Sequence, residues 1–178
     1  MLTICVLVAA LLSAPDYNAL INQWLSDDQT LAGTAYKEIL AAGADAIPAL
    51  VNRLDDPTEI HNGIFQAPLF RRLPNGEEEL VTPTVGDTAF TALRVMIEGR
   101  RVKSVQGTYF LTKENAREWI KALANTSLRD MQLRAVSDSI KRQMVEIKVR
   151  GWQPNDQHNL HCLSSRLEEL TSPEKSLP

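Results

Sequence analysis

The residues best suited to chemistry lie close together near the carboxyl end of the chain: Asp156, His158, His161 and Cys162. Imidazole nitrogens and thiolates are good zinc ligands, and a spacing of three residues on a helix places His158 and His161 on neighbouring positions. A closed zinc site needs four ligands, and a catalytic site needs three and a water molecule. No second Cys-x-x-Cys or His-x-x-x-His pair completes such a set. The sequence therefore favours a solvent-exposed helix start in which Cys162 packs as a small apolar residue.

Other catalytic motifs are missing from the sequence. A nucleophilic Cys162 or serine would need a histidine base oriented by an acid, and such partners usually meet through the fold and not along one helical turn. The chain has no Gly-x-Ser-x-Gly elbow and no glycine-rich phosphate motif. The glutamates at 77–79 and Asp87 are more typical of solvated carboxylates than of a catalytic pair. We expect no cofactor, and we keep an exported enzyme or metal-binding protein built on residues 156–162 as the alternative.

Exposed arginines and one tryptophan are the better candidates for binding a partner. The candidate partner-binding residues are Arg71, Arg72, Arg100, Arg101 and Trp152. The arginines flank an irregular stretch and would form a positive patch for an acidic partner, since arginine is enriched at interfaces. They would alternatively complement the dipole of a preceding helix. Trp24 and Trp119 fall on apolar stripes and are expected in the core, whereas Trp152 falls in a loop.

Size and composition indicate one soluble-type domain. The chain has 178 residues, of which 44% are hydrophobic and 23% charged, so it is long enough to bury a core. The net charge of −3 argues against a nucleic-acid partner, because such domains are usually clearly basic. Two cysteines do not make a disulfide framework. The domain is therefore expected to be held together by packing.

Residues 1–14 are apolar apart from Thr3 and Ser13. The run is shorter than the roughly 20 residues of a membrane-spanning helix and fits the apolar region of a secretory signal. We therefore expect export to the periplasm, the cell envelope or the medium, with no stable membrane span in the mature chain. No Lys or Arg precedes Lys37. The alternative is a buried first helix or an uncleaved anchor.

Beyond residue 15 the apolar residues recur at helical spacing. They predict helices over about 17–25, 29–42, 45–54, 84–99, 112–123 and 127–147, and a last helix before the tail. The predicted N-caps are Asp16, Thr112 and Ser127, and the predicted glycine stops are Gly43 and Gly99. Leu31 and Met144 are expected on buried faces, and Leu50, Phe90 and Val136 in a shared interior.

An irregular insert, residues 58–83, interrupts the helices with five glycines or prolines. Within it Pro74-Asn75-Gly76 predicts a turn between two short extended pieces. A β-prone run also covers residues 102–111. The predicted organisation is therefore a signal-like segment at 1–14, a helical domain at 15–150 containing the insert, and a carboxyl-terminal helix and loose tail at 151–178.

The stretch Leu31–Pro57 resembles a HEAT repeat. The matching features are Ile47-Pro48-Ala49-Leu50 at the start of the second helix and Asp-Asp-Pro at its end. Residues 84–99 are similar to the first helix of such a pair, and residues 84–147 to uncharacterised bacterial proteins with HEAT-like helices. The resemblance implies a mostly α fold, a short stack of antiparallel helical hairpins with a small irregular or β insert. It also implies a non-catalytic protein-binding or scaffolding role, because stacked repeats present an extended face to other proteins.

Overall fold

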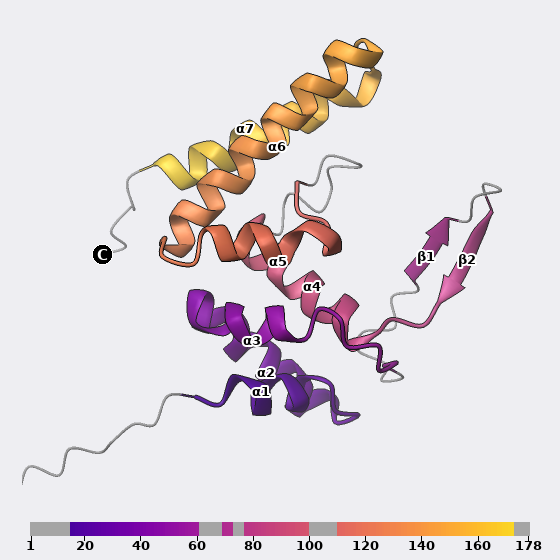
Figure 1. Cartoon of the computed structure of the whole chain (residues 1–178), viewed down its shortest axis with the longest axis vertical. Helices are drawn as coiled ribbons and strands as arrows, with labels where there is room; N and C mark the ends of the chain where they lie inside the picture. The colour runs from indigo at the N-terminus through magenta and orange to yellow at the C-terminus, as the bar shows by residue number, and fades with distance from the viewer. Residues whose placement is uncertain (1–14, 61–68, 73–76, 100–109, 173–178) are drawn as a thin grey trace, which may run out of the picture.

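The computed structural model describes residues 15–60, 69–72, 77–99 and 110–172, and this part of the chain is mostly helical (Figure 1). The helices and strands follow in the order α1 (Tyr17–Trp24), α2 (Gln29–Ala42), the 3-10 helix η1 (Gly43–Ala46), α3 (Ile47–Asn52), β1 (Leu69–Arg72), β2 (Glu78–Val81), α4 (Val85–Ile97), α5 (Lys113–Ala122), α6 (Leu128–Arg150) and α7 (Pro154–Thr171). The predicted signal-like segment, the run at 102–109 and the tail beyond 172 lie outside the described residues. No described helix is long and apolar enough to cross a membrane.

Local sequence signals begin and end most of these helices. The Asp16 carboxylate accepts hydrogen bonds from the first amides of α1, and the Ser127 hydroxyl accepts one from the amide of Asp130 in α6. Thr112 caps α5 in a reciprocal pair with Asn115. Gly43, at φ 58°, ends α2 in a conformation that favours glycine. The predicted caps and the stop at Gly43 are therefore confirmed.

The third predicted helix is divided in two. Residues 43–46 form η1, and α3 begins only at Ile47. Pro48 lies in the first turn of α3, where a missing amide proton removes no hydrogen bond. This corner turns the chain back so that α3 packs against α4 and contacts α1.

One apolar core joins α1–α5 to the start of α6, and we call this part of the molecule the body. Its largest fully buried side chains are Ile21, Trp24, Ile39, Leu50, Leu54, Leu93, Ile97 and Leu111. The Trp24 ring stacks on Tyr36 with 5.1 Å between centroids. Leu50 and Val136 are buried as predicted, and Phe90 is half-buried at the edge of the core.

Strands β1 and β2 pair as an antiparallel hairpin, with Leu69 opposite Val81 and Arg72 opposite Glu78. This confirms the two extended pieces of the insert, whereas the predicted turn at 74–76 lies outside the described residues. The hairpin extends away from the helices (Figure 1). The segments on either side of the hairpin are joined by the hydrogen bond from Ile60 N to Pro83 O, 2.9 Å, and the first of them is joined to α4 by that from Val85 N to Thr58 O, 2.8 Å.

The two longest helices, α6 and α7, pack against each other along their length. The first turns of α6 contribute Met131 and Ala135 to the core, and the rest of the helix carries the pair away from the body (Figure 1). We call the segment from Ile140 through the turn at 151–153 to Leu163 the arm. Leu163 is its fully buried apolar side chain, with Ile140 and Cys162 packed against it.

Two expected inward residues are instead exposed. Leu31 is 41% exposed because α2 turns Ala32, Ala35 and Ile39 toward the core. Met144 is 53% exposed, and the neighbouring Gln143 is fully buried in its place. The apolar pattern predicts Met144 inside because the residue is hydrophobic. Which face of α6 is covered depends instead on the position of α7.

Candidate functional site

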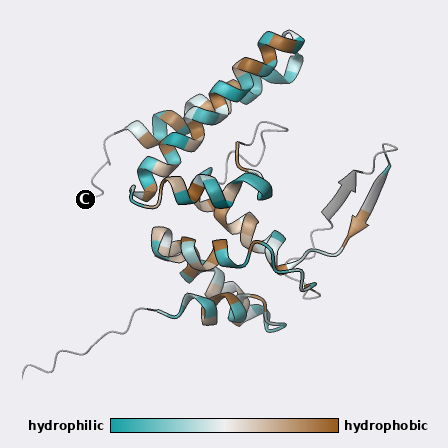
Figure 2. Ribbon diagram, in the orientation of Figure 1, coloured by the Kyte–Doolittle hydropathy of each residue, from teal (hydrophilic) through white to brown (hydrophobic). Residues whose placement is uncertain are grey.

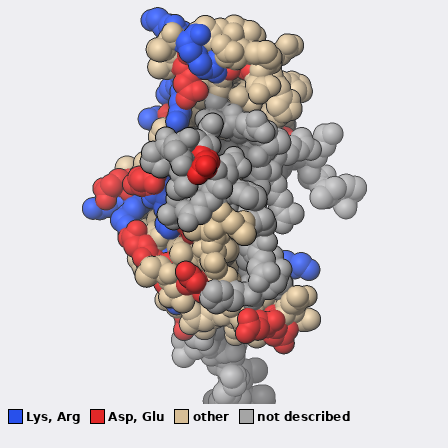
Figure 3. Space-filling model, turned by 90° about the vertical axis from the view of Figure 1, so that its right-hand side faces the viewer, with Lys and Arg blue, Asp and Glu red and all other residues tan. Residues whose placement is uncertain are grey.

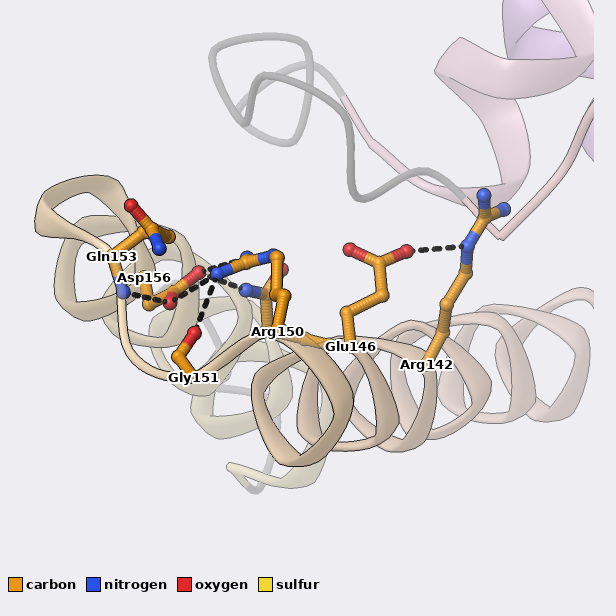
Figure 4. Close-up of polar contacts among 7 residues, drawn as sticks. Arg142, Glu146, Arg150, Gly151, Gln153 and Asp156 are labelled. Atoms are coloured by element: carbon orange, nitrogen blue, oxygen red, sulfur yellow. Dashed lines mark hydrogen bonds and ion pairs between the residues drawn. The ribbon is translucent and has the colours of Figure 1, made fainter.

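The turn of the arm is held by a buried carboxylate (Figure 4). Asp156 lies in the first turn of α7 and is 1% exposed. The Arg150 guanidinium at the end of α6 donates to both carboxylate oxygens, with Nη2–Oδ1 2.6 Å and Nη1–Oδ2 3.0 Å. The Gln143 side-chain amide donates to Oδ1, and the backbone amide of Gln153 donates to Oδ2 at 2.7 Å. We call this set the turn clamp.

The clamp keeps Asp156 ionised. Hydrogen bonds from Arg150 lower the pKa of the Asp156 carboxyl below its ordinary value, and they outweigh the opposing effect of burial. A negative charge in the first turn of α7 also suits the helix dipole. Both groups are therefore charged at neutral pH, and the clamp joins two helices through a bidentate ion pair.

The alternative metal-ligand set at residues 156–162 does not converge in this arrangement. Asp156 is directed into the clamp, while His158 and His161 lie on the exposed side of α7. Cys162 is half-buried, with its Sγ 3.6 Å from Nε2 of His158. Within residues 15–60, 69–72, 77–99 and 110–172, no three His, Cys, Asp or Glu side chains come together in a group that could hold a metal ion.

Outside the clamp the arm presents an apolar surface. Its members are Met144 (53% exposed), Val145 (61%), Val149 (83%) and Trp152 (59%). Together with Lys148 they form what we call the arm-end face. Among the described residues six large hydrophobic side chains are exposed, and four of them are on this face. The helical segments at this end show strongly apolar stretches beside hydrophilic ones (Figure 2).

Lys and Arg side chains gather beside uncharged surface at the same end of the molecule (Figure 3). Trp152 is exposed in the turn, so the structure puts this predicted partner-binding residue on a free surface. Arg71 and Arg72 lie in β1, but their side chains, like all of Arg100 and Arg101, lie outside the described part. The predicted patch of four arginines therefore stays a prediction.

A groove between α3, α5 and the start of α6 is the second candidate surface. Its volume is about 410 Å³, and we call it the α3–α5 groove. Its floor is formed by Ile47, Val51, Ile120 and Met131. No sequence signal marks this groove, because these residues have the same helical spacing as core residues and come from three separate segments.

The rim of the groove is polar. Arg117 of α5 and Asp55, just beyond α3, form an ion pair of 2.6 Å that connects the two sides. Glu118 and Lys121 are exposed beside them. Lys121 forms no ion pair with any described residue. The groove thus combines an apolar floor with one rim cation available to a ligand.

A further hollow of about 460 Å³ lies at the start of α5, next to Asp87, Lys113 and Arg142. The Lys113 ammonium is 2.8 Å from Asp87. Burial would raise the pKa of the Asp87 carboxyl, but hydrogen bonds from Lys113 and Thr84 outweigh it and the pKa is lowered. Asp87 is therefore a paired anion that caps α4, in keeping with a structural carboxylate.

Glu98, at the end of α4, is the buried carboxylate that the sequence did not single out. It is 2% exposed, and it accepts hydrogen bonds from the Leu111 amide at 2.9 Å and from Arg94 Nε at 3.1 Å. Burial raises the pKa of Glu98, and these hydrogen bonds only partly offset the effect. Its place is structural: it joins the end of α4 to the Leu111 backbone just before α5.

Comparison of the chain with protein-family models, with curated proteins and with solved structures gives no match. The geometry of these surfaces is therefore the basis for a functional proposal.

Proposed function

We propose that the chain is a non-catalytic protein-binding module whose helices form a short HEAT-like stack of hairpins. In this proposal the α3–α5 groove receives a segment of a partner protein. The observation that carries it is the groove itself, an apolar depression of about 410 Å³ between α3, α5 and the start of α6. Grooves of this kind bind amphipathic helices, which insert apolar side chains at intervals of three and four residues.

The floor of the groove supplies the affinity in this proposal. Ile47, Val51, Ile120 and Met131 offer an apolar surface from three elements of one packed core. The Arg117–Asp55 pair links α5 to the end of α3, so the two walls are already in place before a partner arrives. A preformed site avoids the entropic cost of ordering its walls on binding.

The rim supplies the selectivity. Lys121 is exposed and forms no ion pair with the described residues, so it is available to a carboxylate of the partner. We therefore expect the partner segment to carry apolar anchors and an acidic residue beside them. The hydrophobic residues 1–14 support a further part of the proposal, that the module works after export in the periplasm, the envelope or the medium.

The test blocks the groove without touching the core. A photoreactive amino acid at Lys121 should cross-link one defined partner in the native fraction, whereas the same amino acid at Lys37 on α2 should not. The isolated partner should bind the wild type and lose at least tenfold in affinity for Ala124→Trp, because Ala124 is exposed and lines the groove.

Ala122→Trp is the matched control, since Ala122 is exposed at the end of α5 but does not line the groove. It should bind like the wild type. Equal loss in both tryptophan variants, or undiminished binding to Ala124→Trp, would contradict the proposal. An unchanged circular-dichroism spectrum would show that the variants fold.

A further inference from the structure

The arm-end face has a composition that suits a charged lipid surface. Met144, Val145 and Val149 project from one side of α6, Lys148 lies among them in helical order, and Trp152 follows in the turn. We propose that this face docks the protein on the surface of an anionic lipid bilayer. Apolar side chains would enter the headgroup boundary while lysine contacts the lipid phosphates.

The charges around the face are arranged for an anionic partner. The acids near it are all paired: Glu146 with Arg142, Asp138 with Arg134 and Lys141, and Asp156 with Arg150. Lys148, by contrast, forms no ion pair with any described residue. The arm end is therefore locally positive on a chain whose net charge is −3. Basic residues near an anionic bilayer each favour binding to it.

The shape of the arm favours a bilayer over a folded partner. The arm carries its turn away from the body (Figure 1), and none of the four exposed apolar residues lines either cavity described above. A projecting apolar end on a folded partner would need a matching hollow, whereas a fluid bilayer needs none. Tryptophan also prefers the headgroup level, where its ring is in an apolar layer and its N–H is hydrated.

The turn clamp makes the face ready to bind. The bidentate contact between Arg150 and Asp156 fixes the end of α6 to the start of α7, and Gly151, at φ 80°, allows the tight reversal between them. Trp152 and Val149 therefore share one rigid end. A surface that is already ordered loses little conformational entropy on docking.

This inference does not depend on the protein-binding groove. Met131 lines the groove and Val149 lies 18 residues farther along the same helix, which corresponds to about 27 Å at 1.5 Å per residue. Lipid docking would bring the module to a bilayer and leave the groove open to its partner. Either surface can be removed by substitution while the other is kept.

The experiment needs a local signal, because the apolar residues 1–14 of the full chain would associate with any vesicle. Trp152 supplies one, since it is exposed whereas Trp24 is buried and Trp119 half-buried. The full chain and Trp152→Phe are mixed with vesicles of phosphatidylcholine and phosphatidylglycerol (3:1), or of phosphatidylcholine alone, each containing a lipid with a doxyl quencher. The difference in emission between the two proteins is the signal of Trp152.

With the anionic vesicles this signal should shift to shorter wavelength and be quenched at least threefold more than with the neutral ones. Lys148→Glu and Val149→Asp should remove the excess quenching, and their high exposure predicts that both variants fold. Lys37→Glu makes the same charge change at an exposed position on α2, and its Trp152 emission should be quenched as in the wild type.

Three results would overturn the proposal. The first is a Trp152 signal that is the same with both kinds of vesicle. The second is a Lys37→Glu variant whose Trp152 signal falls as much as that of Lys148→Glu. The third is a Trp152 signal that responds only to an added protein and not to vesicles. In each of these cases the protein-binding groove could still be confirmed through Ala124→Trp, so the two proposals fail separately.

Discussion

The body and the arm place their apolar residues in opposite ways. In the body the large apolar side chains, such as Trp24, Leu50 and Leu93, are buried together in one core. In the arm Leu163 is the apolar side chain that is fully buried, while Gln143 and Asp156 occupy the interface between the helices. The four large apolar side chains of the arm that are exposed all lie on the arm-end face.

The comparison shows that the two regions are stabilised by different interactions. The body is stabilised by the burial of apolar surface, and this contribution to the free energy of folding is non-directional and large when summed over the core. The arm depends on a few directional contacts around Asp156, and Gln143 Oε1 is buried with no hydrogen-bond partner among the described residues. The four exposed apolar side chains of the arm add nothing to this interior.

The largest effect should come from the core of the body. Leu50 is fully buried between α3 and its neighbours, so Leu50→Ala removes buried area and leaves a cavity. We expect the free energy of unfolding to fall by about 3 kcal/mol. Chemical denaturation followed by circular dichroism measures this change. A loss below about 1 kcal/mol would mean that the body is not packed as described.

A smaller, local effect should come from the turn clamp. Asp156→Asn keeps the size of the side chain but removes the negative charge that pairs with Arg150. We expect the melting temperature to fall by about 5 °C, less than for Leu50→Ala. Amide hydrogen exchange should accelerate across the turn at 151–153 and the start of α7, and not in α2. Equal acceleration in both regions would show that the arm and body open as one unit.

Asp156 in the arm and Glu98 in the body should make the stability depend on pH in opposite directions. The hydrogen bonds of Arg150 lower the pKa of Asp156 from its ordinary value of 3.8. The contribution of Asp156 to the free energy of unfolding is therefore present above pH 3.8 and is lost as the pH falls through the pKa of the folded state. Burial raises the pKa of Glu98 from its ordinary value of 4.5. The contribution of Glu98 to the free energy of unfolding is therefore present below pH 4.5 and is lost as the pH rises through the pKa of the folded state.

We therefore expect amide exchange in the arm to accelerate below pH 4 relative to the rate of an unstructured chain. Glu98→Gln should flatten the pH dependence of unfolding above pH 4.5, and Asp156→Asn should flatten it below pH 4. Unchanged profiles in these variants would assign the dependence to other carboxylates.

The sequence predicted the parts of this comparison that depend on local interactions. Asp16, Thr112 and Ser127 cap helices as expected, because a side-chain oxygen satisfies amides two or three residues away. Gly43 ends α2 and Gly99 follows the end of α4, and both have the positive φ that glycine adopts without steric cost. The two extended pieces around residues 74–76 were also predicted from turn residues.

The parts that depend on distant segments were not predicted. Met144 was expected inside, but α7 covers Gln143 instead. Asp156 was considered as a metal ligand, although Arg150, six residues earlier on another helix, already pairs with it. The α3–α5 groove is lined by residues up to 87 positions apart, from Ala44 to Met131, and has no sequence signature. Which face of a helix is covered depends on tertiary packing, which periodicity alone does not fix.

The smallest effect is expected on the arm-end face, and it decides how that face should be interpreted. Val149→Ser replaces an exposed apolar side chain by a small polar one, and Trp152→Ala removes the exposed ring. If these side chains serve folding, each change should lower the free energy of unfolding by 1 kcal/mol or more. If they are kept for contact with another surface, the change should stay within about 0.5 kcal/mol, as for other surface substitutions. We expect the second result, in a denaturation series run beside Leu50→Ala. Because the cost of exposing apolar area to water persists in every folded molecule, neutrality for folding would leave a binding role as the physical reason for four such residues at one end of the arm.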